Sequence, residues 1–295
     1  MDLQHHSNSN MKNYVCPSCK SALNSGACAN CGFRVKRAGN IPVFFTASLV
    51  SKRYEEIGAF YDDLYENTDD VWSRVASRGR DFDQFVGSLI IAGKPWRLLD
   101  VGCGEGNLLT AVSATEKFGI DISHRALRAA ASRAGAALCV GFAEELPYQT
   151  AFFNAITSIG VMTHFIDDIA ATREINRVLH PEGRYIVGIF IRPTPAERVL
   201  NKISEFVYPR PRPDALFKWL FEKVSKTASG SHNAENNKAR QPVERLYTVR
   251  EVEKKFEACG FEISNVITKR KYPEAPLAGH HFRIYILRKK SDKAN

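Results

Sequence analysis

The sequence has 295 residues, a formal net charge of +9, and 25% charged and 44% hydrophobic residues. That length accommodates one full α/β domain and a smaller module, and the composition is typical of a soluble globular protein. No run of 18 apolar residues occurs and the N-terminus is polar, so we expect a cytoplasmic location with neither a membrane span nor a secretory signal. The positive charge favours an acidic partner such as RNA, an anionic lipid surface or a phosphorylated small molecule.

Four of the seven cysteines form two C-x-x-C pairs separated by eight residues: Cys16, Cys19, Cys28 and Cys31. Two such pairs supply the closed tetrahedral shell of four thiolates that binds structural Zn²⁺. Disulfides are the alternative, and a reducing cytosol disfavours them. We therefore expect a zinc ribbon over residues 12–46, preceded by a disordered tail at residues 1–11.

A glycine-rich turn follows an apolar run that predicts a buried strand near Leu98. The turn contains Gly102, Gly104 and Gly106, and it leads into a helix expected to begin near Asn107. Because glycine lacks a Cβ, the backbone can approach a ligand closely under the exposed amides of the helix start. The G-x-G-x-G spacing differs from the G-x-G-x-x-G of dinucleotide folds. The turn therefore favours a different nucleoside cofactor.

An aspartate ends the next predicted strand, about 20 residues beyond the glycine turn, where doubly wound folds bind a ribose diol. It is Asp121. Strands and helices then alternate, with strands expected near Leu98, Phe118, Leu138, Ile156 and Ile186, which predicts a parallel sheet with its ligand at the carboxyl ends. Asp167 is expected to cap the start of one helix, and Thr248 with Glu251 is expected to form a capping box at the start of another. Two further strands are expected at residues 261–267 and 282–287.

Four ordered motifs resemble those of class I S-adenosylmethionine-dependent methyltransferases of the type 11 group. They are the D-x-G-C-G-x-G turn, the G-x-D that ends at Asp121, residues 143–148 and residues 152–156. Residues 173–184 also resemble the segment that leads into the fifth strand of that family. The resemblance covers roughly residues 96 to 190. It implies a Rossmann-like α/β fold with a seven-stranded sheet over residues 91–290, a helical insertion at 191–246 after the fifth strand, and methyl transfer by in-line displacement.

The resemblance also implies which residues bind S-adenosylmethionine: Asp100, Gly102, Gly104, Gly106, Asp121, Ile122, Phe142, Ala143, Ser158 and Gly160. Asp121 would accept the ribose hydroxyls and Ile122 would flank the adenine. Phe142 stands where the family often has an acidic or polar residue for the adenine amino group, so the backbone of Ala143 is the expected substitute.

Three further segments are candidates for the substrate side of the site. Residues 47–90 resemble the helical lid of many small-molecule methyltransferases, with Tyr61 and Tyr65 facing the cofactor; a helix packed on the sheet edge is the alternative. The insertion would form a substrate roof with Phe217 and Trp219, or a buried amphipathic helix, or a contact with a membrane surface. His164 has the ordinary pKa of a general base, although a loop histidine can also be purely structural.

We therefore expect a methyltransferase that acts on a small molecule, either a sugar, a lipid-linked compound or a secondary metabolite. The cysteine module also resembles that of ribosomal RNA guanine-N1 methyltransferases, which usually have histidine where this chain has Cys31, so RNA is an alternative substrate. A catalytically inactive cofactor-binding protein whose ribbon docks on a partner is the other alternative.

Overall fold

A computed structural model describes residues 11–46, 52–66, 80–114, 116–194, 243, 245–277 and 281–290. The chain divides into two compact units, residues 1–191 with 242–295 and residues 192–241, and the described residues belong almost entirely to the first. Residues 1–10 of the expected N-terminal tail and the predicted insertion helices, with Phe217 and Trp219, lie outside the described residues. The last residue assigned to that tail, Met11, is instead buried in a 3-10 turn, because its side chain packs in the hydrophobic core. Among the described helices, none is long and apolar enough to cross a bilayer.

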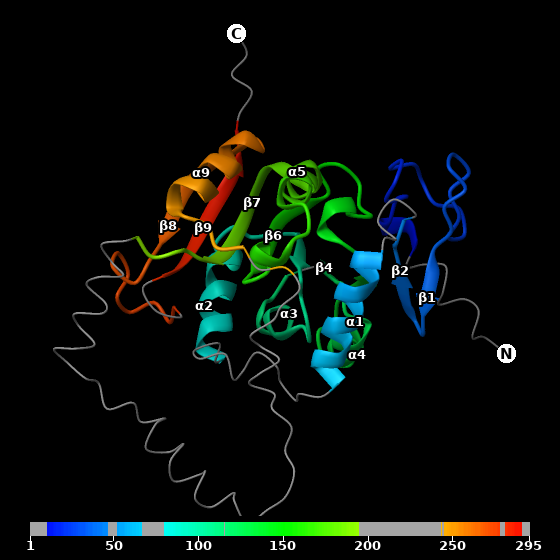
Figure 1. Cartoon of the computed structure of the whole chain (residues 1–295), viewed down its shortest axis with the longest axis horizontal. Coiled ribbons are helices and arrows are strands. Elements are labelled where there is room, and N and C mark those ends of the chain that lie inside the picture. Colours follow the sequence, from blue (N-terminus) through cyan, green and yellow to red (C-terminus); the bar gives the residue numbers. More distant parts are fainter. Residues whose placement is uncertain are drawn as a thin grey trace, which may run out of the picture. The chain divides into compact units, whose positions relative to one another are not determined.

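One sheet organises the first unit, in the strand order β1-β2-β5-β4-β3-β6-β7-β9-β8 (Figure 1). The strands are β1 Lys36–Ala38, β2 Ile41–Val43, β3 Arg97–Val101, β4 Glu116–Asp121, β5 Ala137–Val140, β6 Phe153–Ile159, β7 Leu179–Phe190, β8 Phe261–Ile267 and β9 Phe282–Lys289. Strands β3 to β7 run parallel, and β9 is antiparallel to both β7 and β8. The central strands are almost wholly buried because helices cover both faces.

The sheet contains two more strands than the seven that we predicted. Strands β3 to β9 make up the expected seven, whereas β1 and β2 come from the cysteine module at the N-terminus. Strand β2 pairs parallel with β5, and β1 pairs antiparallel with β2. The predicted seven strands are therefore confirmed, and the module extends their sheet to nine strands.

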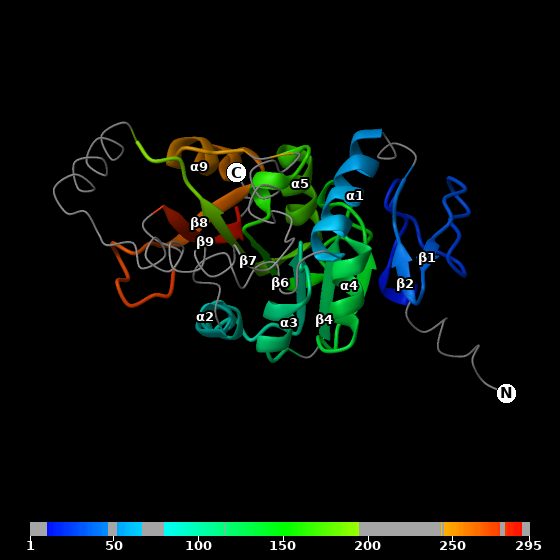
Figure 2. The same ribbon diagram turned by 60° about the horizontal axis from the view of Figure 1, so that its bottom comes forward.

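Helices lie on both faces of this sheet: α5 Asp168–Val178 and α9 Val249–Ala258 on one, and α2 Arg80–Ile91, α3 Asn107–Ala111 and α4 His124–Ala131 on the other (Figure 2). Helix α1 spans Lys52–Glu66, and the 3-10 turns are η1 Met11–Asn13, η2 Ala143–Glu145 and η3 Met162–His164. Asp167 accepts two backbone hydrogen bonds at the start of α5, and Thr248 forms a capping box with Glu251 at the start of α9. Both predicted caps are confirmed.

Each face of the sheet has its own hydrophobic core. Ile175 of α5 and Phe256 of α9 belong to the first, and Phe82 and Leu109 belong to the second. Complete burial of such side chains stabilises the fold by about 1.5–3 kcal/mol each. The first core also contains three residues of the N-terminal module: Met11, Tyr14 and Phe44. The module therefore shares a hydrophobic core with helices α5 and α9 of the sheet's first face.

Candidate cofactor site

The glycine turn after β3 owes its shape to two glycines that have different neighbours. Gly102 has φ +70, and a Cβ there would lie 2.5 Å from both Cγ atoms of Val161, so only glycine fits. Gly106 has φ +75 and would place a Cβ 3.0 Å from the Cβ of Ala134. Gly102 lines the pocket, whereas Gly106 does not and instead lets the start of α3 pack closely against the end of α4.

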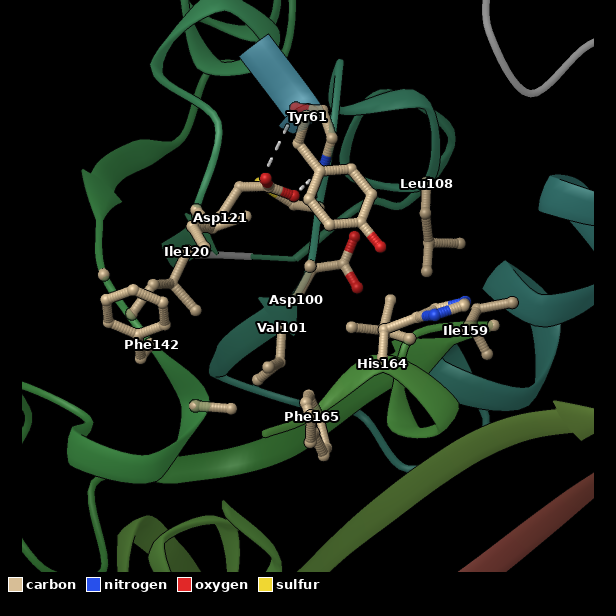
Figure 3. Close-up of a pocket in the computed structure, with 18 of the residues that line it drawn as sticks. Tyr61, Asp100, Val101, Leu108, Ile120, Asp121, Phe142, Ile159, His164 and Phe165 are labelled. Carbon is tan, nitrogen blue, oxygen red and sulfur yellow. Dashed lines mark hydrogen bonds between the residues drawn. The ribbon is translucent and has the colours of Figure 1, made fainter. Parts of the chain in front are cut away.

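Two carboxylates lie beside this turn, one at the end of each of two neighbouring strands (Figure 3). Asp121 of β4 accepts hydrogen bonds from the backbone N–H groups of Gly104 and Ser123, each at 2.8 Å. Its burial raises the pKa of its carboxyl to about 6. Asp100 of β3 is buried and accepts a hydrogen bond from Thr157 Oγ1 at 2.7 Å. Both acidic residues that the resemblance singled out therefore line one pocket.

Helix α1 covers this end of the sheet and contributes Ile57, Tyr61 and Tyr65 to the pocket lining. It is held to the turn after β4, because Asp62 Oδ1 accepts hydrogen bonds from Ser123 Oγ at 2.7 Å and from the backbone N–H of Arg125 at 3.1 Å. The two interpretations of this helix are thus compatible, since it packs on the sheet and also lines the pocket.

The segment after β5 forms one wall of the pocket. We call residues 141–145 the pocket wall; Phe142, Ala143 and Glu144 line the cavity. Glu144 Oε1 accepts hydrogen bonds from the backbone N–H groups of Ile166 at 2.8 Å and Asp167 at 3.1 Å. Burial raises the pKa of the Glu144 carboxyl. Glu144 thereby connects the pocket wall to the loop after β6.

That loop, residues 160–167, carries the predicted base. Gly160 and His164 both line the pocket. His164 Nδ1 lies 2.7 Å from the carbonyl oxygen of Val243. A carbonyl can only accept, so Nδ1 carries the hydrogen and the neutral ring presents Nε2 as its basic nitrogen. Ser158, in contrast, is buried below the pocket, with its Oγ 2.6 Å from the hydroxyl of Tyr185, and does not line the cavity.

Arg245 donates hydrogen bonds to three backbone carbonyl groups of the same loop. No pattern in the sequence predicts these contacts. Its backbone N–H donates to the carbonyl of Thr163 at 2.9 Å, and its guanidinium donates to the carbonyls of Phe165 and, at 2.7 Å, Ile166. Asp83 of α2 is another pocket-lining residue that we missed. No local motif marks either residue, because each reaches the site from a distant part of the sequence.

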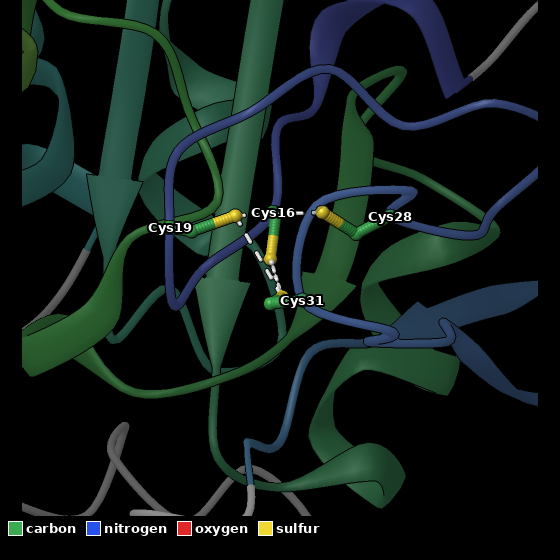
Figure 4. A group of neighbouring side chains, drawn as sticks. All are labelled: Cys16, Cys19, Cys28 and Cys31. Carbon is green, nitrogen blue, oxygen red and sulfur yellow. Dashed lines mark hydrogen bonds between the residues drawn. The ribbon is translucent and has the colours of Figure 1, made fainter.

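The four cysteines of the N-terminal module form a compact cluster (Figure 4). Their Sγ atoms all lie within 4.8 Å of one another, and three pairs are 3.4–3.6 Å apart. Zinc–sulfur bonds of about 2.3 Å in a tetrahedron place sulfurs about 3.8 Å apart, so the cluster fits a zinc ribbon. All seven cysteines of the chain lie in the described residues and none forms a disulfide.

The two C-x-x-C turns also share a backbone geometry. Lys20 follows the first turn with φ +61 and donates its N–H to the carbonyl of Cys16 at 2.9 Å. Gly32 follows the second with φ +76 and donates to the carbonyl of Cys28 at 3.0 Å. Each turn thus directs two sulfurs toward the other turn, as a four-thiolate metal site requires.

Comparison with known proteins agrees with this geometry. Residues 99–187 match the family model described as a methyltransferase domain. Residues 99–187 therefore form a methyltransferase domain. A solved structure of 1,6-didemethyltoxoflavin-N1-methyltransferase from Burkholderia thailandensis, with its substrate and S-adenosylhomocysteine bound, has a TM-score of 0.52 and 17% identity, and the match covers 84% of this chain and 94% of that chain. At that identity the likeness establishes the fold of the methyltransferase domain alone.

Two curated relatives of the methyltransferase domain are named for different activities. The probable tRNA methyltransferase 9B of Mus musculus is 30% identical over 188 residues, which are 61% of this chain and 38% of the relative. The 27-O-demethylrifamycin SV methyltransferase of Amycolatopsis mediterranei is 30% identical over 166 residues, with 48% of this chain and 61% of the relative covered. The chain thus spans less than two thirds of the length of either relative.

Proposed function

We propose that the chain transfers the methyl group of S-adenosylmethionine to a nucleophile on a small molecule. The observation that carries this proposal is that one pocket brings together the glycine turn, Asp121 and His164 at the carboxyl ends of the parallel strands. That edge is where open α/β sheets bind their ligands. One cavity thus contains a glycine turn and a carboxylate that suit a nucleoside, together with an imidazole that suits a base.

In this proposal each side of the pocket binds a different part of the cofactor. Asp121 accepts the ribose hydroxyls, Asp100 faces the methionine part, and Ile122 with Phe142 flanks the adenine. The cofactor supplies an electrophilic methyl group on a sulfonium. The residues of the chain align the nucleophile with that methyl group and exclude water, which supplies most of the rate enhancement in an in-line displacement.

His164 is proposed to accept the proton that the nucleophile loses. With Nδ1 donating to Val243, the lone pair of the neutral ring is at Nε2. A hydroxyl would give its proton to Nε2 as its oxygen bonds to the methyl carbon, whereas a protonated amine would give its proton to Nε2 before its nitrogen can attack. In either case the bond from the methyl carbon to sulfur would break, and its electron pair would stay on the sulfur. A base in this position typically contributes about 10²–10⁴-fold to the rate.

The four cysteines are proposed to bind one Zn²⁺ ion with a structural role. Four sulfur ligands leave no open coordination position, so this ion would take no part in methyl transfer. Metal analysis of the purified chain tests the assignment. We expect one zinc ion per chain, lost after Cys16→Ser; an unchanged metal content in that variant would contradict it.

RNA is the second candidate substrate, favoured by the charge of the N-terminal module. Residues 11–46 contain five Lys or Arg residues and no Asp or Glu. Such a segment suits a phosphate-rich partner. The mouse relative is named as a probable tRNA methyltransferase, which is consistent with this alternative.

A labelling experiment separates the candidate functions. The chain is incubated with methyl-labelled S-adenosylmethionine and either a small-molecule filtrate or the total RNA of a cell extract. We expect label in the filtrate, and label in RNA would support the alternative instead. Binding of S-adenosylhomocysteine without transfer to either fraction would favour the inactive cofactor-binding protein and contradict the proposal.

A further inference from the structure

The cysteine module is joined to the pocket wall through the sheet. Strand β2 pairs with β5 at Val43 and Val140, and the backbone N–H of Phe44 donates to the carbonyl of Val140 at 2.9 Å. Strand β5 leads directly into the pocket wall, because Val140 is followed by residues 141–145. A displacement of β2 would therefore be transmitted to the backbone that precedes the wall.

Side chains of the two residues after this pairing contact the pocket wall itself. The ring of Phe45 lies 5.0 Å from the ring of Phe142, centroid to centroid. Thr46 is 1% exposed, and its Oγ1 donates to Glu145 Oε2 at 2.5 Å. The module thus contacts both the first and the last side chain of the pocket wall.

The chain of contacts begins at the four cysteines. The second C-x-x-C turn is closed by a hydrogen bond from the N–H of Cys28 to the carbonyl of Phe33, and the ring of Phe33 stacks on that of Phe44 at 6.4 Å. Phe44 in turn lies 4.9 Å from Tyr14, whose ring is 5.4 Å from Tyr148 in the core of the methyltransferase domain.

The first C-x-x-C turn is attached to the same domain independently. The backbone N–H of Val15 donates to the carbonyl of Pro147 at 2.9 Å. Lys20 Nζ forms an ion pair with Glu174 at 2.7 Å and donates to the carbonyl of Leu146 at 3.4 Å. Both C-x-x-C turns, which would ligate the metal, are therefore connected to residues 146–148, the segment that follows the pocket wall.

We propose that the zinc-bound module positions the pocket wall, so that metal binding at the four cysteines strengthens binding of the cofactor. This inference rests on the proposed function, because it takes the pocket to bind S-adenosylmethionine. Small four-cysteine modules depend on their metal to fold. Without the metal, Phe33 and Phe45 lose their fixed positions, and Phe142 loses the ring that packs behind it. The coupling is reciprocal, so bound cofactor also strengthens binding of the metal.

Calorimetric titration of the zinc-loaded full chain with S-adenosylhomocysteine tests the inference through Phe45→Ala. We expect loss of this ring contact to weaken the affinity about fivefold and to leave the zinc content unchanged. Thermal stability should fall slightly, because Phe45 also packs against the second hydrophobic core. Trp96→Ala is the matched control, because Trp96 is 60% exposed and precedes β3 at the opposite end of the strands from the pocket. We expect its affinity to equal that of the wild type.

A second measurement follows the metal directly, as the zinc affinity obtained from equilibrium competition with a chromophoric chelator. We expect saturating S-adenosylhomocysteine to raise the zinc affinity of the wild type and of Trp96→Ala, and to raise it less in Phe45→Ala. Wild-type affinity for S-adenosylhomocysteine in Phe45→Ala, together with a zinc affinity that the ligand does not change, would overturn the inference alone. If the zinc-loaded wild type binds no S-adenosylhomocysteine, the proposed function fails as well.

Discussion

The pocket wall and the loop at residues 160–167 enclose the same cavity, but different interactions hold them in place. The wall rests on ring contacts and strand pairing with the N-terminal module, and on one hydrogen bond from Thr46. The loop buries Met162 and Phe165, and polar contacts hold its backbone, since Arg245 donates to its carbonyls and Glu144 accepts from its amides. Ring packing is spread over many atoms, whereas each polar contact depends on one side chain. Loss of one polar side chain should therefore affect the loop more than loss of one ring affects the wall.

The largest expected effect follows removal of Nε2 from the loop. In His164→Asn the amide can still donate to the carbonyl of Val243, so the loop keeps this contact while the proposed base is lost. We expect kcat to fall about 100-fold, as for other general bases, with the affinity for S-adenosylhomocysteine unchanged. Steady-state kinetics with the methyl acceptor identified by the labelling experiment measure this change in kcat. A kcat close to that of the wild type would exclude His164 as the base.

The next effect comes from the contact between the glycine turn and the loop. Gly102→Ala places a Cβ 2.5 Å from the Cγ atoms of Val161 at a positive φ. Overpacking of this kind predicts about a 30-fold loss of cofactor affinity in calorimetry. Gly87→Ala is the control, because its added Cβ would meet Val112 Cγ2 at 3.4 Å and its backbone is helical. Equal affinities of the two variants would show that the turn does not contact the ligand.

Arg245 tests whether the polar support of the loop matters for catalysis. Arg245→Ala leaves the carbonyls of Phe165 and Ile166 without their donor, so we expect kcat to fall about tenfold. The affinity for S-adenosylhomocysteine should change less than kcat, since the pocket wall keeps its own support. Arg250→Ala, on the exposed side of α9, is the control. A loss in affinity as large as the loss in kcat would contradict a role in positioning His164.

The smallest effect is a dependence of cofactor binding on pH. Burial raises the pKa of Asp121 to about 6, so its carboxyl is protonated below that pH and ionised above it. The ionised form accepts ribose hydroxyls better, and we expect affinity about fourfold lower at about pH 5.5 than at about pH 7.5. Because the folded chain holds this proton more tightly than the unfolded chain, stability falls as the pH rises between 3.8 and about 6.

Asp121→Asn should remove the pH dependence of binding. The amide does not ionise, so the affinity for S-adenosylhomocysteine should be weak and nearly constant over this range. A wild-type affinity that does not vary with pH would instead show that Asp121 is already ionised throughout, or that it does not contact the cofactor.

The sequence predicts the parts of the site that are local in the chain. The glycine turn, Asp121 and the cap at Asp167 each depend on a few consecutive residues, and the structure places them as the pattern implies. The pairing of β2 with β5 is different, because a three-residue strand carries almost no pattern of its own. Arg245 lies about 80 residues from the carbonyls that it binds, and no spacing rule connects them. Such contacts form only when the whole chain has folded.

Calorimetric titration of the zinc-loaded wild type with S-adenosylhomocysteine, alongside Gly102→Ala, tests the central claim most directly. We expect one molecule bound per wild-type chain and a greatly weakened interaction in the variant, with both proteins folded by circular dichroism. A folded wild-type chain that gives no heat of binding would contradict the claim that this pocket is the cofactor site.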